Sequence, residues 1–413
     1  MASVNGEFRK LAAGYLFPEI KRRVNEWKAL HPGVSVLSLG IGNTTEALSP
    51  AVVAAIKERA ELLAHRETYT GYGDEQGEPT LREALSGYYK TLGVHLQPDE
   101  FFISDGAKAD AANIQQLFDS HSVVAVQDPA YPVYVDSNVV AGRAGTYSQQ
   151  EERYTNLVYL PCVEEKGFIP AVPARHVDLI YLCNPNNPTG AVATKSQLKD
   201  FVDYALEHKA VIIYDAAYSE YISDPNLPRS IYEISGAELC AIEINSFSKF
   251  SGFTGVRLGW TIVPKSLGCT DSAPGELHRM WFRRQSTFFN GASNLAQSGG
   301  LAALHGDGLA QSRSLVAYYK ENARIIRQGL QAVGLTVHGG TDSPYVWTRV
   351  PKGMGSWEFF DLLLDQCHVV VTPGAGFGPS GEGYVRVSSY GHKEDVEAAM
   401  ASIRRNLRKE DLE

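Results

Sequence analysis

Short apolar segments alternate with longer amphipathic segments through the middle of the chain. The apolar segments are rich in Val, Ile and Tyr, and most of them end at a turn residue or at Asp, Asn or Ser. They comprise residues 101–103, 123–126, 179–183, 211–214 and 241–244. Continuous apolar runs of this length are typical of strands that are buried on both faces of a mainly parallel sheet.

The segments between these strands carry the signals of helix starts. Ser49 and Pro50 precede a helical pattern over 51–63, a second pattern covers 107–118, and Thr194 or Ser196 caps a third over 197–208. A cap residue followed by proline in the first turn is a common way for a helix to begin. Strands that alternate with helices predict a doubly wound α/β domain with helices on both faces of the sheet.

The last third of the chain has a different order of elements. A long helical pattern over 309–332 leads to two β segments, a helix over 357–367, two further β segments and a last helix over 394–407. This order is typical of a smaller α+β domain. We therefore expect a large α/β domain over 46–295. We expect the small domain to be formed by both chain ends, 1–45 and 296–413.

Composition and charge exclude several classes of protein. Of the 413 residues 44% are hydrophobic, and 38 Lys and Arg stand against 47 Asp and Glu, giving a net charge of −9. These are globular proportions, and the acidic balance argues against a nucleic-acid binder. No apolar run approaches the roughly 20 residues that span a bilayer. The five cysteines form no C-x-x-C pair, and the histidines have no metal-ligand spacing, so we expect neither a disulfide framework nor a metal site.

The absence of a hydrophobic signal segment at the N-terminus favours a cytoplasmic location. A plastid stroma protein that has lost its transit peptide is the alternative.

One lysine stands apart from the solvated majority. Lys249 follows the apolar run 241–245 and is surrounded by serines in the segment 246–252. A desolvated lysine has a lowered pKa and can form a Schiff base with a carbonyl group. Arg257 follows eight residues later, and arginine and serine side chains both suit a phosphate group. Lysine chemistry beside a phosphate site points to pyridoxal phosphate.

Three further segments follow predicted strands. Asp215 has the type required at a pyridinium nitrogen, although a helix N-cap is the simpler interpretation, and Tyr218 could tune the cofactor ring. The segment 104–110 lies between a strand and a helix and could bind an anion through its backbone. Asn187, in the turn 184–190, could donate to the ring hydroxyl group.

Together these segments resemble the fold-type I, pyridoxal-phosphate-dependent aminotransferases of class I and II. The motifs NPNNPTG, YDAAY, SFSKFSGFTGVRLGW and YVRVS occur in that family's order, and the resemblance extends from about residue 15 to residue 386. It implies that Lys249 is the Schiff-base lysine and the proton shuttle. It also implies that the cofactor is held by Tyr72, Ala107, Lys108, Tyr131, Asn187, Asp215, Tyr218, Ser246, Ser248, Arg257 and Asn290.

The segments 13–20, 39–48, 71–85, 103–110, 127–143 and 289–297 resemble most closely the branch of that family that acts on LL-diaminopimelate. This branch interconverts LL-diaminopimelate and 2-oxoglutarate with tetrahydrodipicolinate and L-glutamate by a ping-pong reaction. The resemblance implies that Arg386 clamps the α-carboxylate of the substrate. The other implied substrate contacts are Tyr15, Gly42, Glu75, Lys108, Tyr131, Asn187 and Asn290. It also implies a homodimer in which Tyr72, Glu75 and Asn290 cross to the neighbouring site.

Two alternatives stay open at this point. One is an aminotransferase of different specificity, such as a lysine-directed relative of the plant defence type. The other is a non-enzymatic protein that retains the fold as a binding module, which the intact Lys249 and Arg386 disfavour. Two chance matches are set aside. Ser246-x-x-Lys249 lacks the partner motifs of penicillin-binding enzymes, and the glycine run 374–378 lacks the last glycine of a dinucleotide loop.

Overall fold

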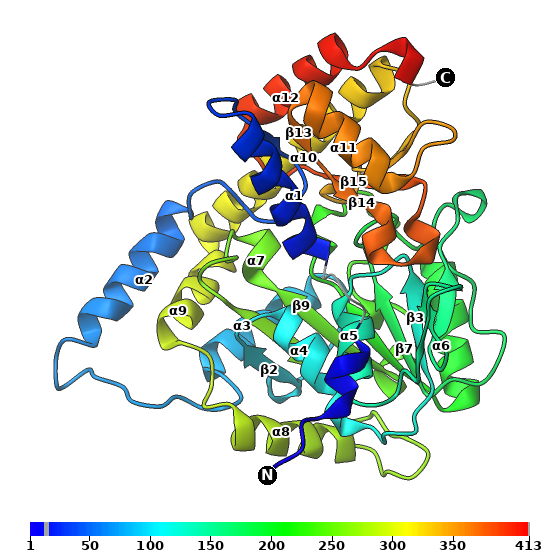
Figure 1. Ribbon diagram of the computed structural model, residues 1–413. Coiled ribbons are helices and arrows are strands. Elements are labelled where there is room, and N and C mark those ends of the chain that lie inside the picture. The colour runs from blue at the N-terminus through cyan, green and yellow to red at the C-terminus, as the bar shows by residue number, and fades with distance from the viewer. Residues whose placement is uncertain (12–15, 412–413) are drawn as a thin grey trace.

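The computed structural model describes residues 1–11 and 16–411 (Figure 1). Its centre is a seven-stranded sheet in the order β2-β10-β9-β8-β7-β3-β6. The strands are β2 (Phe101–Ser104), β3 (Val124–Asp128), β6 (Val158–Pro161), β7 (Leu179–Cys183), β8 (Val211–Asp215), β9 (Ala241–Ser246) and β10 (Gly259–Ile262). Neighbouring strands are parallel, except that β10 is antiparallel to both β2 and β9. The prediction of an α/β fold with a mainly parallel sheet is confirmed.

All five predicted apolar segments form strands of this sheet, and their apolar residues contribute to the core on both faces, with Glu243 of β9 a buried charged exception. Strands β6 and β10 were not predicted from the sequence. Each has four residues, and β10 begins at a glycine. The β10 segment has glycine and threonine at two of its four positions, and β6 ends at a proline, so neither reads as a continuous apolar run.

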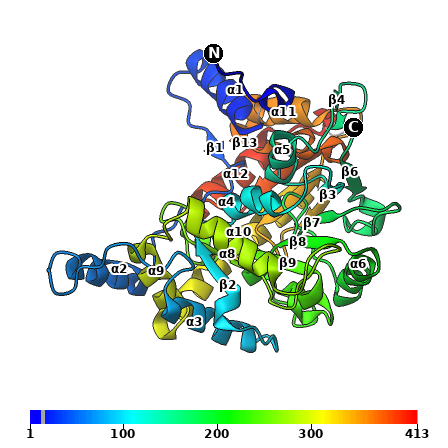
Figure 2. The same cartoon turned by 90° about the horizontal axis from the view of Figure 1, so that it is seen from below.

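Among the described residues, twelve α-helices pack around this sheet and a second, smaller one. Thr194 caps α6, because its hydroxyl accepts from the N–H of Gln197 while the Gln197 side chain accepts from the N–H of Thr194. The helices are α1 (Leu16–Leu30), α2 (Pro50–Leu62), α3 (Pro79–Lys90), α4 (Ala107–Asn113), α5 (Val133–Val140), α6 (Lys195–His208), α7 (Phe247–Phe250), α8 (Glu276–Phe288), α9 (Asn294–Ala303), α10 (Gly306–Ala332), α11 (Ser356–Cys367) and α12 (Lys393–Asn406). Figure 2 shows α2 and α9 side by side at one end of the molecule.

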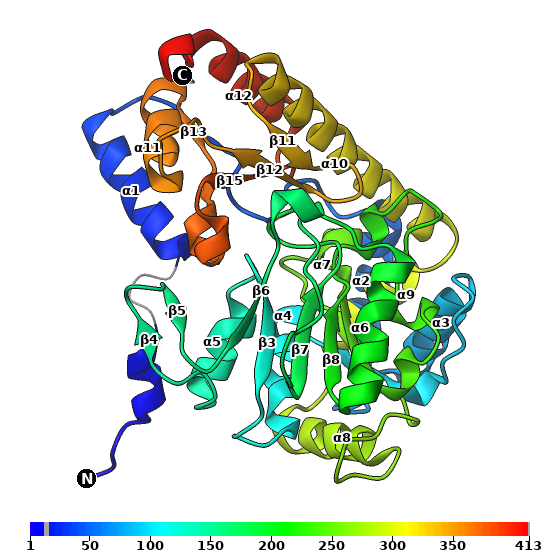
Figure 3. The ribbon, with the colours of Figure 1, turned by 90° about the vertical axis from the view of Figure 1, so that its right-hand side faces the viewer.

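The C-terminal third forms a second sheet in the order β11-β12-β15-β14. Its strands are β11 (Val337–Gly339), β12 (Tyr345–Arg349), β14 (Thr372–Pro373) and β15 (Tyr384–Ser388). Two further pairs of short strands lie outside these two sheets. Strand β1 (Leu37–Ser38) is parallel to β13 (Val369–Val370), and β4 (Tyr147–Ser148) is antiparallel to β5 (Arg153–Tyr154). Figure 3 shows the second sheet above the ends of β3, β7 and β8.

Helix α1, near the start of the chain, packs against elements of the C-terminal third. Helix α1 lies beside α11, where the Arg23 guanidinium pairs with Asp361 at 2.6 Å and lies 4.4 Å from the Trp357 ring (Figures 1 and 3). Leu16 and Trp27 of α1 share an apolar cluster with the C-terminal elements. The division into domains 46–295 and 1–45 with 296–413 stays a prediction. Within the part of the chain that the structure describes, no helix is long and apolar enough to cross a membrane.

Candidate active site

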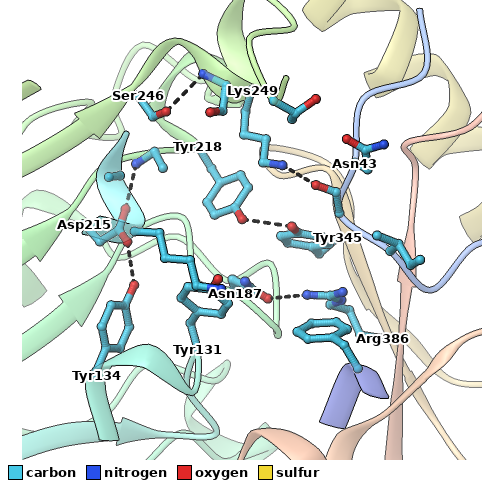
Figure 4. Close-up of a pocket in the computed structure, with 18 of the residues that line it drawn as sticks. Asn43, Tyr131, Tyr134, Asn187, Asp215, Tyr218, Ser246, Lys249, Tyr345 and Arg386 are labelled. Carbon is cyan, nitrogen blue, oxygen red and sulfur yellow. Dashed lines mark hydrogen bonds between the residues drawn. The ribbon is translucent and has the colours of Figure 1, made fainter. Parts of the chain in front are cut away.

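A cavity of about 480 Å³ lies where the carboxyl ends of the central strands face the second sheet (Figure 4). In a parallel sheet the segments that follow the strands meet at one edge, so residues far apart in the sequence converge there. The cavity is lined by Phe17, Ile41, Gly42, Asn43, Ala107, Lys108, Tyr131, Tyr134, Asn187, Asp215, Ala217, Tyr218, Ser246, Ser248, Lys249, Thr254, Arg257, Tyr345 and Arg386.

Lys249 extends into this cavity from the short helix α7, which follows β9 directly. Its Nζ donates to the carbonyl oxygen of Gly42 and lies 5.0 Å from the centre of the Tyr390 ring. Desolvation, together with the nearby guanidinium groups of Arg386 and Arg257, lowers the pKa of Lys249 to about 7. The amine is therefore neutral in a large fraction of molecules at neutral pH, which is the form that attacks a carbonyl carbon.

Asp215 ends the buried strand β8 and lies at the base of the cavity. One carboxylate oxygen accepts from the Tyr134 hydroxyl at 2.6 Å, and the other accepts from the N–H of Ala217 at 3.0 Å. Burial raises the pKa of Asp215, and these two hydrogen bonds oppose that shift. A buried carboxylate with no cation against it is an environment that favours a cationic ligand group such as a pyridinium.

The side chains that could donate hydrogen bonds to a phosphate group line another wall of the cavity. Ser246 caps α7 by accepting from the N–H of Ser248 at 3.0 Å, and the Arg257 guanidinium donates to the Ser248 hydroxyl at 3.4 Å. Gly106 has φ of 130°, and a Cβ atom there would lie 2.2 Å from Nη2 of Arg257. The positive φ favours glycine here, and a side chain would also force the Arg257 guanidinium to move.

Arg386 lies on β15 and is 1% exposed. Its Nη1 donates to Oδ1 of Asn187 at 2.7 Å, and its Nη2 donates to the carbonyl oxygen of Gly40 at 2.7 Å. Since Asn187 uses its amide oxygen for the guanidinium, its amide nitrogen is the group able to donate to a ligand. Among the described residues, the printed partners of this buried guanidinium are neutral oxygens, so it attracts an anion, and a carboxylate suits its geometry.

Two aromatic residues of the predicted set also line the cavity. Tyr131 lies 5.8 Å from the Lys108 ammonium group, measured to the ring centre, and burial raises its pKa. The Tyr218 hydroxyl lies 2.9 Å from the Tyr345 hydroxyl. The structure thus brings together most of the predicted site residues, namely Gly42, Ala107, Lys108, Tyr131, Asn187, Asp215, Tyr218, Ser246, Ser248, Lys249, Arg257 and Arg386.

The structure leaves three of the predicted residues apart from this group. Tyr72, Glu75 and Asn290 are not among the described residues that line the cavity, and Tyr72 is 87% exposed. The segments that carry them lie against each other, because a Cβ atom on Gly291 would lie 3.7 Å from Cα of Glu75. Tyr15 lies outside the described residues.

Comparison with known proteins identifies the family of this chain. Residues 34–403 match the model of the family described as aminotransferase class I and II. The chain belongs to this family. It is 48% identical over 405 residues to an LL-diaminopimelate aminotransferase of Agathobacter rectalis, which covers 98% of this chain and 100% of that protein.

Solved structures show the same relationship. A structure of the L,L-diaminopimelate aminotransferase of Chlamydomonas reinhardtii superposes with a TM-score of 0.93 at 45% identity and 98% coverage of both chains. The substrate-bound BacF structure of Bacillus subtilis has a TM-score of 0.82 at 27% identity, again with 98% of both chains covered. The fold is therefore the fold-type I aminotransferase fold.

Aminotransferases of class I and II use pyridoxal 5′-phosphate, and the residues present fit this cofactor. The cavity combines a lysine of lowered pKa with a buried carboxylate at its base. The side chains of Ser246, Ser248 and Arg257, which can donate hydrogen bonds to a phosphate, line the cavity. Arg257 lies close to Gly106, which has no side chain to occupy that space. A phosphate, a pyridinium and an aldehyde each find a partner of matching chemistry there.

Sequence analysis missed several residues of this cavity. They are Phe17, Ile41, Asn43, Tyr134, Ala217, Thr254 and Tyr345. Tyr134 had a weak signal, since it follows Tyr131 by three residues and helical spacing places both side chains on one face. Tyr345 had no such signal, because its partner Tyr218 is 127 residues away in the sequence.

Proposed function

We propose that this aminotransferase transfers an amino group from LL-2,6-diaminopimelate to 2-oxoglutarate, and that the products are L-glutamate and tetrahydrodipicolinate. The observation that supports this specificity is the similarity to the diaminopimelate aminotransferases of Agathobacter rectalis and Chlamydomonas reinhardtii, which extends over nearly the whole chain. Such a reaction supplies a precursor for the biosynthesis of lysine and peptidoglycan. A cytoplasmic or plastid-stroma location stays a prediction.

We assign the cofactor contacts by chemistry and position. Lys249 would carry the Schiff base, and Asp215 would pair with the pyridinium nitrogen. Tyr218 and Asn187 would donate to the ring hydroxyl group, and Tyr131 would stack on the ring. The phosphate would be held by Ser246, Ser248, Arg257 and the backbone of Ala107 and Lys108.

The amine of Lys249 also suits the proton transfer. The bound cofactor supplies the electron sink that stabilises negative charge at the substrate α-carbon. Lys249, once displaced by the substrate amine, would take the α-proton on its Nζ and return it to the cofactor carbon. A base with a pKa near 7 is well matched to such transfers at neutral pH.

Arg386 would clamp the α-carboxylate of each substrate through a bidentate pair. Gly42, Lys108, Tyr131 and Asn187 line the same cavity and would complete this end of the substrate site, with Tyr15 outside the described residues. Glu75 and Lys108 are the types needed at the distal end of diaminopimelate, which carries an ammonium and a carboxylate.

We also propose a homodimer with shared sites. Tyr72, Glu75 and Asn290 do not line the cavity of their own subunit, and Tyr72 and Phe288 are 87% and 72% exposed. Large exposed aromatic side chains on neighbouring segments are typical of an interface. In this arrangement Tyr72 would reach the phosphate in the partner subunit, while Glu75 and Asn290 would reach its substrate.

A screen of amino donors with 2-oxoglutarate tests the proposed specificity. We expect the highest kcat/KM with LL-diaminopimelate, measured as glutamate formed. A higher value with lysine would instead favour the lysine-directed alternative. No transfer from any donor, by a protein that has bound the cofactor, would favour a binding module.

A further inference from the structure

One residue of the cavity wall, Tyr345, contacts both functional halves of the site (Figure 4). It is the first residue of β12 and is 1% exposed. Its hydroxyl lies 2.9 Å from the Tyr218 hydroxyl, and the centre of its ring lies 4.4 Å from the Arg386 guanidinium carbon. The hydroxyl therefore faces the cofactor side of the cavity, while the ring faces the carboxylate side.

The hydrogen bond between the two tyrosines is constrained by its protons. Each phenol has one proton to donate, and its oxygen can also accept. If Tyr218 donates its proton to the cofactor ring oxygen, the proton between the two phenols must come from Tyr345. Accepting this bond makes Tyr218 a stronger donor, because hydrogen bonds in a chain polarise one another.

The ring of Tyr345 lies against the Arg386 guanidinium, with the guanidinium carbon 4.4 Å from the centre of the Tyr345 ring and 4.9 Å from that of Phe377. Asn187 and Gly40 hold the edges of the guanidinium with their oxygens. Arg386 pairs with Trp347 across the sheet, so Tyr345, two residues before Trp347, lies on the same sheet face as Arg386. A guanidinium over an aromatic face is stabilised by the negative charge of the ring face.

The space beside Gly42 is occupied by the same hydroxyl. A Cβ atom on Gly42 would lie 2.5 Å from the Tyr345 hydroxyl oxygen and 3.5 Å from the ring carbon that carries it. Gly42 does not have a positive φ, so its backbone conformation does not demand glycine. The absence of a side chain at position 42 is explained instead by the position of the Tyr345 hydroxyl.

We propose that Tyr345 is a positioning residue with two separable roles, the hydroxyl directing Tyr218 toward the cofactor and the ring holding Arg386 for the carboxylate. Gly42 permits both roles by leaving room for the hydroxyl. This inference rests on the proposed roles of Tyr218 and Arg386. It does not depend on which amino acid the enzyme uses.

Two variants separate the roles. Tyr345→Phe keeps the ring and removes the hydroxyl, whereas Tyr345→Met fills the space but removes both groups. The first readout is the pH midpoint of the visible absorption change of the holoenzyme. The second is the dissociation constant of glutarate, measured by calorimetry on the holoenzyme and on the cofactor-free enzyme.

For Tyr345→Phe we expect the spectral midpoint to rise by about 0.5 to 1 pH unit, the size expected for one neutral hydrogen bond. The sign follows because a hydrogen-bond donor favours the form with more negative charge. The glutarate dissociation constant should stay within about twofold, since the aromatic face remains. For Tyr345→Met the midpoint should rise likewise, and glutarate should bind about three- to tenfold more weakly. Tyr345→Leu replaces Tyr345→Met if the latter does not fold.

Gly42→Ala tests the hydroxyl without changing the tyrosine. The added Cβ should displace the hydroxyl and raise the spectral midpoint as Tyr345→Phe does. In the double variant Gly42→Ala/Tyr345→Phe the clash is absent, because the nearest ring carbon lies at an ordinary contact distance of 3.5 Å. We therefore expect the double variant to match Tyr345→Phe alone in midpoint and in melting temperature.

Tyr204→Phe is the matched control, because it removes a hydroxyl that donates to the backbone carbonyl oxygen of Arg175, and Tyr204 is not among the residues that line the cavity. It should change neither readout. An unchanged midpoint in Tyr345→Phe would overturn the role of the hydroxyl, and unchanged glutarate binding in Tyr345→Met would overturn the role of the ring. Failure of LL-diaminopimelate as a donor would leave both readouts intact, so it would count against the proposed specificity alone.

Discussion

The amine of Lys249 would both bind the cofactor covalently and transfer the proton. Lys249→Ala should abolish the covalent attachment of the cofactor, so that borohydride reduction fixes the cofactor to the wild type but leaves it removable from the denatured variant. In the cofactor-free wild type, the rate at which pyridoxal phosphate forms a Schiff base should rise through pH 7, because the pKa of Lys249 is lowered to about 7. Stopped-flow absorbance measures this profile. A midpoint near the ordinary value for lysine would contradict the lowered pKa.

Arg386 gives a second prediction at the scale of one residue. Arg386→Lys keeps the charge but loses the fork that spans Asn187 and Gly40. We expect KM for every carboxylate substrate to rise about 10- to 100-fold, the range for losing a hydrogen bond to a charged group. Steady-state kinetics with both the donor and the acceptor measure this change. A rise for only one of them would argue against an α-carboxylate clamp.

Several residues that sequence analysis found lie at or shortly after the carboxyl ends of apolar strands. Asp215 ends β8, Lys249 lies three residues after β9, and Asn187 lies four residues after β7, so their type and their place at the edge of the sheet are both visible in the sequence. Tyr345 begins a strand of the other sheet and acts through contacts with Tyr218 and Arg386. Such contacts depend on how the two sheets are placed, which local patterns do not encode.

At the scale of elements, α5 and β8 meet through the hydrogen bond from Tyr134 to Asp215. Burial raises the pKa of Asp215 above its ordinary value of 3.8. Between that value and the raised pKa, the folded cofactor-free protein binds more protons than the unfolded chain. The free energy of unfolding must therefore fall as the pH rises through this window, by up to about 1.4 kcal/mol per pH unit.

Asp215→Asn should remove this component of the pH dependence, since the amide does not titrate. Tyr134→Phe should widen the window, because losing the donor raises the pKa of Asp215 further. Urea unfolding of the cofactor-free proteins at a series of pH values measures both effects. If Asp215→Asn and the wild type have the same pH profile, Asp215 is not the group responsible.

Helices and strands could be predicted from the sequence where their hydrophobic pattern was distinct. The five apolar strands and the helices α6, α10, α11 and α12 follow clear periodicities. The predicted helix over 107–118 ends as an α-helix at Asn113 and continues as a tighter 3-10 turn over Ile114–Leu117. Strand β1 had no signal, because two residues form it only by pairing with β13 from the other end of the chain.

At the scale of the whole molecule, the net charge is −9, but one cavity carries mostly positively charged side chains. Lys108, Lys249, Arg257 and Arg386 all line one cavity, opposed there by the single carboxylate of Asp215 among the described residues. The average charge excluded a nucleic-acid binder but gave no indication of a site for anions. A concentration of positive charge in a cleft of an acidic protein attracts small anionic ligands to that cleft.

The proposed dimer makes the last prediction, since Tyr72 does not line the cavity of its own subunit. A hybrid dimer of one Lys249→Ala subunit and one Tyr72→Ala subunit can be isolated with two affinity tags. If Tyr72 serves the partner's site, one site loses both residues and the other keeps both. Such a hybrid should have about half of the wild-type activity, because the two-fold dimer has two equivalent sites.

The matched control is a hybrid of one wild-type subunit and one subunit that carries both substitutions. It has the same composition, but each of its sites lacks one of the two residues. We expect its activity to fall well below that of the first hybrid, by about tenfold if Tyr72 donates to the phosphate. If Tyr72 acted within its own subunit, the order would reverse, because the wild-type subunit of the control would then keep an intact site. Equal activities would mean that Tyr72 contributes to neither site.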